Sequence, residues 1–208
     1  MLFISLRYVR RRRQRDSIWG FSTAYKHEND YATIASDVRR GCGTGTKRLR
    51  FCRTSGLVKP NALIVDHSLS PATLAAEILA ARRYDTFWDT GDEALARAAL
   101  APDFIDNTLP SGRAQGVAGV LKASSNFRTA VPDLRCEVRQ MIVAGNRVVT
   151  HLHFTGHFTG SFMGKAGQGQ KVDFIATDIY RLSDGRIAED WHLEDNLTFL
   201  QRIGFVAH

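Results

Sequence analysis

Apolar residues recur at helical spacing between residues 71 and 90. The steps between them are four, three, three and four residues, which places them on one face of a helix. Ser70 followed by Pro71 predicts the start of this helix, because serine caps free N–H groups and proline suits the first turn. The members of this apolar face are Leu74, Ile78, Ala81, Tyr84 and Trp88.

Two further helices are expected before the strands begin. Thr90-Gly91-Asp92 ends the first helix and opens a second over residues 93–100, which Pro102 breaks. Residues 104–107 form a short extended piece. A third helix covers residues 116–130, with its apolar side chains facing inward.

The second half of the chain is typical of strands. A hairpin turn at residues 144–146 joins the first two strands, and the glycine-rich loop 160–169 is a candidate lid. Asp195 is expected to cap a short last helix. Grouped helices followed by consecutive antiparallel strands predict an α+β fold with helices on one face of the sheet. The expected strands are residues 134–143, 147–158, 171–182 and 186–194.

The turn between the last two strands sets which side chains share a face. We expect a three-residue loop, Ser183 to Gly185, closed by a left-handed glycine. This register places Asp178 opposite Asp190, and it makes Asp178 and His192 a diagonal pair on one face, roughly 7 Å apart. A two-residue loop would shift the register by one and separate the pair.

The two faces of this hairpin differ in chemistry. One face mixes small, aromatic and titratable groups, as the wall of a pocket does, and the other is largely apolar. The first face consists of Phe174, Ala176, Asp178, Tyr180, Ala188, Asp190 and His192. The second consists of Ile175, Ile179, Ile187, Trp191 and Leu193. Acids and a histidine on a half-buried strand serve no packing purpose, so they suggest a functional site.

The charge of the chain is unevenly distributed. The net charge is +7 and the pI about 9.7. Residues 1–60 carry +10, whereas the rest of the chain carries −3. The basic pI therefore does not indicate that the domain binds nucleic acid. We expect residues 1–68 to be a basic extension with little fixed structure, outside the native domain, and residues 69–208 to be that domain.

The remaining composition excludes several classes of protein. The three cysteines are odd in number and widely spaced, which argues against a disulfide framework and a zinc site. No apolar run reaches the length of a membrane span. We expect a cytoplasmic protein with no metal, no membrane and no nucleic-acid partner.

Four short motifs together resemble the SnoaL-like polyketide cyclases, also called ester cyclases, of the nuclear transport factor 2-like superfamily. The resemblance covers about residues 71–204. The motifs are Tyr84 with Phe87-Trp88 and Thr90-Gly91-Asp92; Pro102-Asp103-Phe104 with Asp106-Asn107; Thr155-Gly156 with Thr159-Gly160; and Asp178-Ile179-Tyr180-Arg181-Leu182 with Asp184-Gly185-Arg186-Ile187 and Trp191.

The resemblance implies a cone-shaped fold, in which three helices pack on a strongly curved antiparallel sheet around a pocket, with a short C-terminal helix. It implies ring closure by an intramolecular aldol step without a metal or organic cofactor. The acid/base position on the last strand, Asp in those enzymes, falls on His192. A second pocket position, His in those enzymes, falls on Asp178, and a third falls on Asp106. The acid and the imidazole are thus exchanged between strands.

Abstraction of a proton next to a carbonyl needs a base with a pKa near the working pH, and histidine provides one. Our hypothesis makes His192 the base and later the acid, with Asp178 or Asp190 orienting it. Asp106 or Tyr180 would bind the substrate or its enolate oxygen. The remaining candidates for substrate binding are Phe174, Trp88 and Phe162.

Each candidate also has a purely structural interpretation. His192 could be bonded to a neighbouring acid without catalytic work, and Asp178 could pair with Arg181 or Arg186. His151, His153 and His157 alternate on one strand and could hold a metal. We expect them instead to lie on a solvated or partly packed face.

Three functions follow from these observations. The first is a small cofactor-independent cyclase or isomerase acting on an apolar, polyketide-like carbonyl compound. The second is a non-catalytic binding module, favoured if aromatic rings fill the cone. The third resembles an epoxide hydrolase, but no arginine obviously joins the acids. The apolar outer face of the sheet suggests a homodimer.

Overall fold

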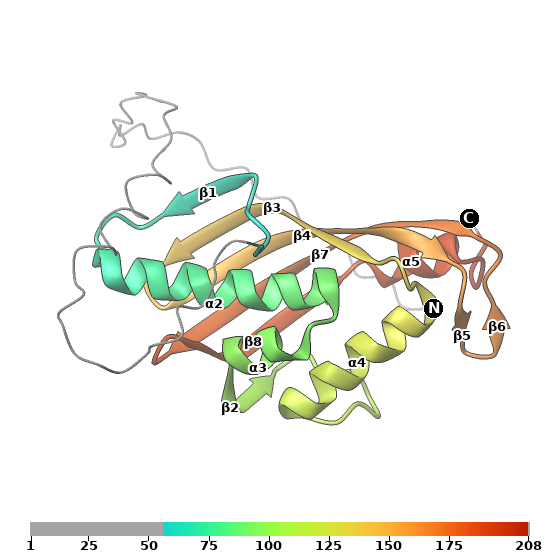
Figure 1. Cartoon of the computed structure of the whole chain (residues 1–208), viewed down its shortest axis with the longest axis horizontal. Coiled ribbons are helices and arrows are strands. Elements are labelled where there is room, and N and C mark those ends of the chain that lie inside the picture. The colour runs from blue at the N-terminus through green and yellow to red at the C-terminus, as the bar shows by residue number, and fades with distance from the viewer. Residues whose placement is uncertain (1–55, 208) are drawn as a thin grey trace, which may run out of the picture. The chain divides into compact units, whose positions relative to one another are not determined.

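The computed structural model describes residues 56–207, and the expectations for residues 1–55 lie outside this range. The described residues form four helices and a mixed sheet, an α+β architecture as expected (Figure 1). The helices are α2 (Pro71–Thr90), α3 (Glu93–Ala99), α4 (Gly116–Ala130) and α5 (Asn196–Arg202).

The main sheet has six strands in the order β1-β3-β4-β7-β8-β2. The four central strands are antiparallel, but each edge strand runs parallel to its neighbour, so the sheet is mixed and not wholly antiparallel. Each edge strand is separated from its partner by a long stretch of chain that includes at least one helix, and such long connections permit parallel pairing. The strands are β1 (Ala62–Val65), β2 (Leu100–Asp106), β3 (Arg135–Ala144), β4 (Arg147–Phe158), β7 (Gln170–Ser183) and β8 (Arg186–Glu194).

Strand β1 lies within the segment expected to be an extension. It pairs with β3 from residue 62 onward, so the sheet begins before residue 69. The loop expected at 160–169 contains a small hairpin, β5 (Ser161–Phe162) and β6 (Lys165–Ala166).

The helix boundaries follow the local signals in the sequence. Ser70 caps α2 by accepting a hydrogen bond from the N–H of Thr73 at 3.1 Å, and Gly91 ends it in the left-handed conformation with φ 77°. Asp195 caps α5 through the N–H of Thr198 at 3.0 Å, as predicted. These caps satisfy backbone groups that helix ends leave free.

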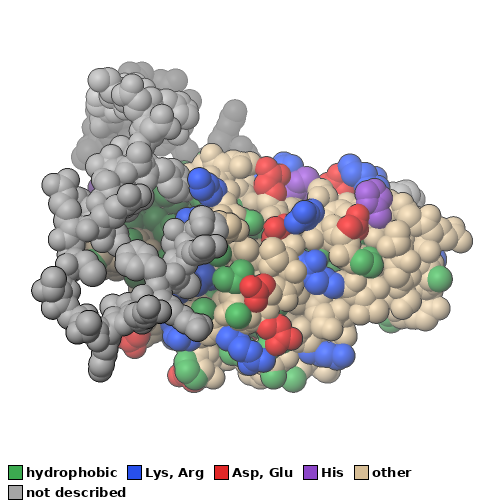
Figure 2. Space-filling model, in the orientation of Figure 1, with side chains coloured by type: hydrophobic (Ala, Val, Ile, Leu, Met, Phe, Trp, Pro, Cys, Tyr) green, Lys and Arg blue, Asp and Glu red, His purple; other side chains and the backbone are tan. Residues whose placement is uncertain are grey.

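Helices α2, α3 and α4 cover one face of the sheet (Figure 1). The core lies between them and the inward side chains of the central strands, with Phe87 of α2 and Tyr180 of β7 among its fully buried members. Burial of one such apolar side chain stabilises the fold by about 1.5–3 kcal/mol. On the face in Figure 2, acidic and basic side chains are interspersed over the described surface.

The β7–β8 turn differs from the prediction. Ser183 pairs with Arg186, so the loop has two residues, and both have positive φ, 51° at Asp184 and 71° at Gly185. Such a turn matches the right-handed twist of the strands it joins. The three-residue loop was therefore wrong.

A bulge on β8 adds a second one-residue shift to that of the shorter loop, so the side chains return to their predicted faces although the pairing moves by two residues. Leu182 pairs with Ile187, but Arg181 pairs with Glu189, so Ala188 has no opposite partner. Beyond the bulge, the inward and outward positions return to the predicted pattern. Between the turn and the bulge the inward and outward positions are reversed, so Ile187, expected on the outer face, is fully buried.

Among the described residues, no helix is both long and apolar enough to cross a membrane. Within the same residues, no group of three or more His, Cys, Asp and Glu side chains is arranged to hold a metal ion. The three histidines of β4 instead have separate partners: Thr177 for His151, Asp133 for His157, and Asp173, Arg139 and Glu137 for His153.

Candidate active site

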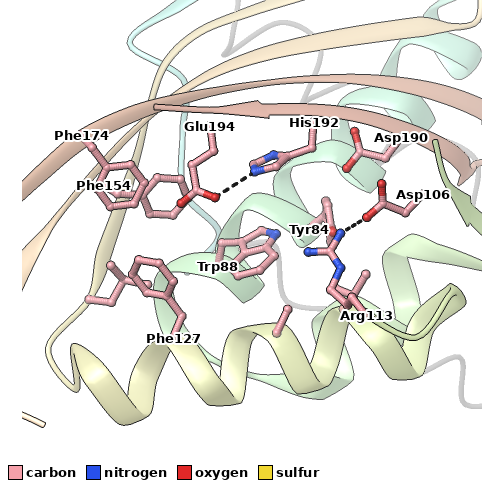
Figure 3. A pocket seen from close by; sticks show the side chains of 13 residues that line it. Tyr84, Trp88, Asp106, Arg113, Phe127, Phe154, Phe174, Asp190, His192 and Glu194 are labelled. Atoms are coloured by element: carbon pink, nitrogen blue, oxygen red, sulfur yellow. Dashed lines mark hydrogen bonds and ion pairs between the residues drawn. The ribbon is translucent and has the colours of Figure 1, made fainter. Parts of the chain in front are cut away.

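A cavity of about 100 Å³ lies between β8 and the helices α2 and α4 (Figure 3). Aromatic rings form one end and ionisable groups the other. The aromatic and apolar lining residues are Tyr84, Trp88, Val120, Ala123, Phe127, Leu134, Phe154 and Phe174. The ionisable lining residues are Asp106, Arg113, Asp190, His192 and Glu194.

Strand β8 supplies three of the ionisable groups. Asp190, His192 and Glu194 alternate along the strand and point to the same side, over the cavity (Figure 3). Alternation with period two explains their shared direction, and the bulge decides that this direction is inward.

The imidazole of His192 lies between two carboxyl groups. Its Nδ1 is hydrogen-bonded to Oδ1 of Asp178, and its Nε2 lies 3.4 Å from Oε2 of Glu194. Burial would lower the pKa of His192, but the charges and hydrogen bonds of Asp178 and Glu194 outweigh burial and raise that pKa to about 11. The ring is therefore an imidazolium at neutral pH.

Asp190 also holds a proton, but as a carboxyl group it is then uncharged. Asp190 is 4% exposed, and its Oδ1 makes no hydrogen bond to any described residue. Burial and then the repulsion of Asp178 raise the pKa of Asp190 well above its usual value. A carboxyl group held neutral in this way can donate a hydrogen bond to an oxygen in the cavity.

Arg113 faces β8 from the segment that leads into α4. It forms an ion pair with Asp106, the last residue of β2 (Figure 3). The side chain of Gln115 fixes the backbone of Asp106. It accepts a hydrogen bond from the N–H of Asp106 at 2.7 Å and donates one to the carbonyl of Asp106 at 2.9 Å. Nε of Arg113 is buried and makes no hydrogen bond within the described part of the chain.

The fold and the cavity agree with comparisons to known proteins. A family model described as SnoaL-like polyketide cyclase matches residues 78–203. The chain belongs to the SnoaL-like polyketide cyclase family. A comparison with curated proteins finds no match.

Several solved structures resemble this SnoaL-like chain. A candidate polyketide cyclase from Bacillus cereus is 42% identical over 73% of this chain and 96% of its own, with a TM-score of 0.68. IdmH, a candidate polyketide cyclase from Streptomyces antibioticus, is 25% identical over 64% of this chain and 96% of its own, with a TM-score of 0.54. AclR, a candidate hydroxylase from Streptomyces galilaeus, is 23% identical over 66% of this chain and 83% of its own; its TM-score of 0.56 indicates a shared fold alone.

The structure places most of the predicted residues of this SnoaL-like protein at one site. His192, Asp190, Asp106, Trp88 and Phe174 all line the cavity.

Three other predicted residues do not line the cavity. Asp178 and Tyr180 are buried behind its wall. Phe162 lies on the β5–β6 hairpin and packs against Phe199 and Phe205, so it does not take the expected substrate-binding position.

Two ionisable residues of the cavity were not predicted. Glu194 follows His192 by two residues, so the strand period could have identified it. Arg113 carries no such signal, because it lies in an irregular segment whose path depends on Asp106 and Gln115. The arginine partners considered for Asp178 are engaged elsewhere: Arg181 pairs with Glu189, and Arg186 donates to the carbonyl of Leu100.

Proposed function

We propose that this SnoaL-like protein is a cofactor-independent enzyme that moves a proton next to a carbonyl group of a small apolar compound, closing a ring or shifting a double bond. The observation that supports this most is the grouping of a histidine–acid pair, a neutral acid and an arginine around one apolar cavity. Such a set supplies the acid, the base and the oxygen-binding groups that enolisation needs.

The protonation states suggest how the roles are divided. Because the imidazole of His192 carries a proton at neutral pH, its first role is that of acid and not of base. The carboxylate of Glu194 faces the cavity beside it and is the candidate base. Asp178 orients the imidazole and stabilises its charge. His192 can accept a proton only after giving its own to the substrate.

The oxygen of the enolate would lie between Asp190 and Arg113. The neutral carboxyl of Asp190 and Nε of Arg113 both lack partners within the described residues. Donors placed where negative charge develops contribute a large part of catalysis in enzymes of this kind. Asp106 holds the arginine in place through their ion pair.

The size of the cavity favours a small substrate. An apolar cavity of roughly 150 Å³ holds benzene, and this one measures about 100 Å³. The rings of Phe154 and Phe174 form its apolar end, stacked with centroids 5.1 Å apart. They leave this volume open, which supports the catalytic proposal over a purely binding function.

Deuterium exchange tests the chemistry without knowledge of the natural substrate. Acetylacetone, ethyl acetoacetate and 2-cyclohexenone in D₂O are followed by proton NMR with and without the protein. We expect exchange at the carbon next to the carbonyl to exceed the buffer rate and to fall about 10²-fold or more in Glu194→Gln and His192→Asn. His157→Asn is the matched control, because His157 also pairs with an aspartate but lies outside the cavity.

Either of two results would contradict the proposal. One is exchange that never exceeds the buffer rate although the compounds bind, which favours a non-catalytic binding module. The other is a fall of the exchange rate in the His157→Asn control as large as that in Glu194→Gln and His192→Asn.

We also propose a homodimer formed by the outer face of the sheet. This face exposes Ile175, Ile179 and Leu193, by 42%, 41% and 77%. Sedimentation of the wild type and of Leu193→Glu tests the interface; a wild-type monomer would disprove it. A cytoplasmic setting remains a proposal that rests on the cysteine pattern.

A further inference from the structure

A carboxylic acid that the proposed reaction does not use lies behind the cavity wall. Asp85 belongs to α2, is fully buried, and has its Oδ1 2.9 Å from the hydroxyl of Tyr180. The same hydroxyl lies 3.0 Å from Oδ2 of Asp178, whose other oxygen is bonded to His192. A continuous chain of hydrogen bonds therefore joins Asp85 to the imidazole.

The hydroxyl of Tyr180 has three oxygen neighbours and one proton. The third neighbour is Oγ1 of Thr150, which donates to the hydroxyl at 3.2 Å. A hydroxyl donates one hydrogen bond and accepts two. If Asp85 and Asp178 were both ionised, one carboxylate would face a lone pair of the hydroxyl with no proton between them. One of the two acids must therefore carry a proton.

The surroundings identify Asp85 as the protonated acid. Asp178 faces the imidazolium, which favours its anionic form. Oδ2 of Asp85 is buried and makes no hydrogen bond among residues 56–207, a position in which a negative charge is costly. Burial and the repulsion of Asp178 raise the pKa of Asp85 well above its usual value, and the Tyr180 hydrogen bond and the charge of Arg82 lower it by less. The thiol of Cys136 is a further titratable group nearby.

We propose that Asp85 is a positioning residue of the active site: as a neutral acid it donates to Tyr180, which directs the tyrosine proton to Asp178 and holds that carboxylate for His192. All three contacts of the hydroxyl are then satisfied, two accepted and one donated. The effect on turnover rests on the proposed function, but the proton states of the chain do not.

Nitrogen NMR of the histidine ring tests these proton states without any substrate. The titration of His192 is measured in the full-length protein and in Asp85→Asn. An asparagine amide is uncharged and donates to Tyr180 as the neutral acid does, so we expect the His192 midpoint to move by less than about 0.5 unit. If Asp85 were ionised, its replacement would remove a negative charge near the ring. A fall of about one unit or more would then overturn the proposal.

Tyr180→Phe tests the chain of hydrogen bonds between Asp85 and His192 at its middle residue. It removes the donor to Asp178, so we expect the Nδ1 proton signal of His192 to move and kcat to fall more than about tenfold with little change in KM. Ser124→Ala is the control, since Ser124 is a buried hydroxyl of α4 without a hydrogen bond.

Circular dichroism checks that the Tyr180→Phe protein is folded. If the folded variant keeps both the Nδ1 signal and kcat, Tyr180 does not connect Asp85 to His192 and the proposal is overturned. If no carbonyl compound is turned over at all, the proposed function fails. The NMR signals would still decide the role of Asp85.

Discussion

Asp178 on β7 lies directly opposite His192 on β8, and its carboxyl group is hydrogen-bonded to Nδ1 of the imidazole. Side chains directly opposite each other across a strand pair are closer than the diagonal pair that the sequence suggested. The imidazole is thereby held with its other nitrogen toward Glu194 and the cavity.

This ion pair predicts a loss of stability in alkaline solution. The pKa of His192 is raised from 6.5 to about 11, so the folded protein keeps a proton that the unfolded chain releases. The contribution is fully present below pH 6.5 and is lost as the pH rises toward 11, by up to about 1.4 kcal/mol per pH unit. Urea unfolding at several pH values should show the advantage of the wild type over His192→Gln shrinking from pH 7 to pH 10.

His157→Gln provides the control for this measurement, because the pair of His157 with Asp133 is largely exposed. Exposed pairs contribute little to stability. A difference between wild type and His192→Gln that stays constant with pH would contradict the prediction.

Replacement of Asp85 by Asn should stabilise the protein at neutral pH. The pKa of Asp85 is raised by burial, so the folded state holds a proton that the unfolded chain releases above about pH 3.9. The wild type therefore loses stability as the pH rises from 4, whereas the amide does not titrate. The gain of Asp85→Asn should grow between pH 5 and pH 7 by up to about 1.4 kcal/mol per unit. Thermal or urea unfolding measures it, and a gain independent of pH would show that Asp85 is ionised in the folded protein.

Arg113→Lys should impair the reaction more than the fold. Lysine keeps the positive charge beside Asp106 but lacks the Nε–H proposed to bind the enolate oxygen. We expect the exchange rate to fall about 10²-fold, the size of effect known for the loss of one oxyanion donor. Arg97→Lys is the matched control, because Arg97 forms an exposed pair with Glu93 on α3. Equal rates for Arg113→Lys and wild type would remove Arg113 from the oxygen-binding role.

Gly119→Ala, a substitution in α4, should disturb the segment that carries Arg113. A Cβ at Gly119 would lie 1.7 Å from the carbonyl oxygen of Ala114, the residue after Arg113. The segment must move, so we expect lower stability, by about 1–3 kcal/mol, together with slower exchange. Ala118→Ser, exposed on the same helix, should stay within about 0.5 kcal/mol of wild type. Unchanged stability of Gly119→Ala would show that the segment yields easily.

Much of the fold followed from local patterns. The start of α2 at Pro71 and both ends of α4 were predicted, because caps, proline and apolar spacing act within a few residues of one another. The motifs around Trp88 and Asp178 identified the family that the comparisons confirm.

Local signals were not sufficient for the register at the site. The two-residue turn at Asp184 and the bulge at Ala188 each shift the pairing by one residue in the same direction. His192 therefore keeps its predicted face but lies opposite Asp178 and not diagonal to it. Neither is visible in the alternation of apolar and polar residues, since both depend on how the strands twist and pack.

The sequence therefore determined the helices, the four central strands, the α+β class and the shared face of Asp178, Asp190 and His192. Only the tertiary structure decided that Arg113 and Glu194 share the cavity of Asp190 and His192 and that Asp85 lies behind it. Arg113, Glu194 and Asp85 belong to three separate elements or loops, and long-range packing alone brings them together. The same packing removes their carboxyl and imidazole groups from water, which sets protonation states that no residue type or spacing specifies.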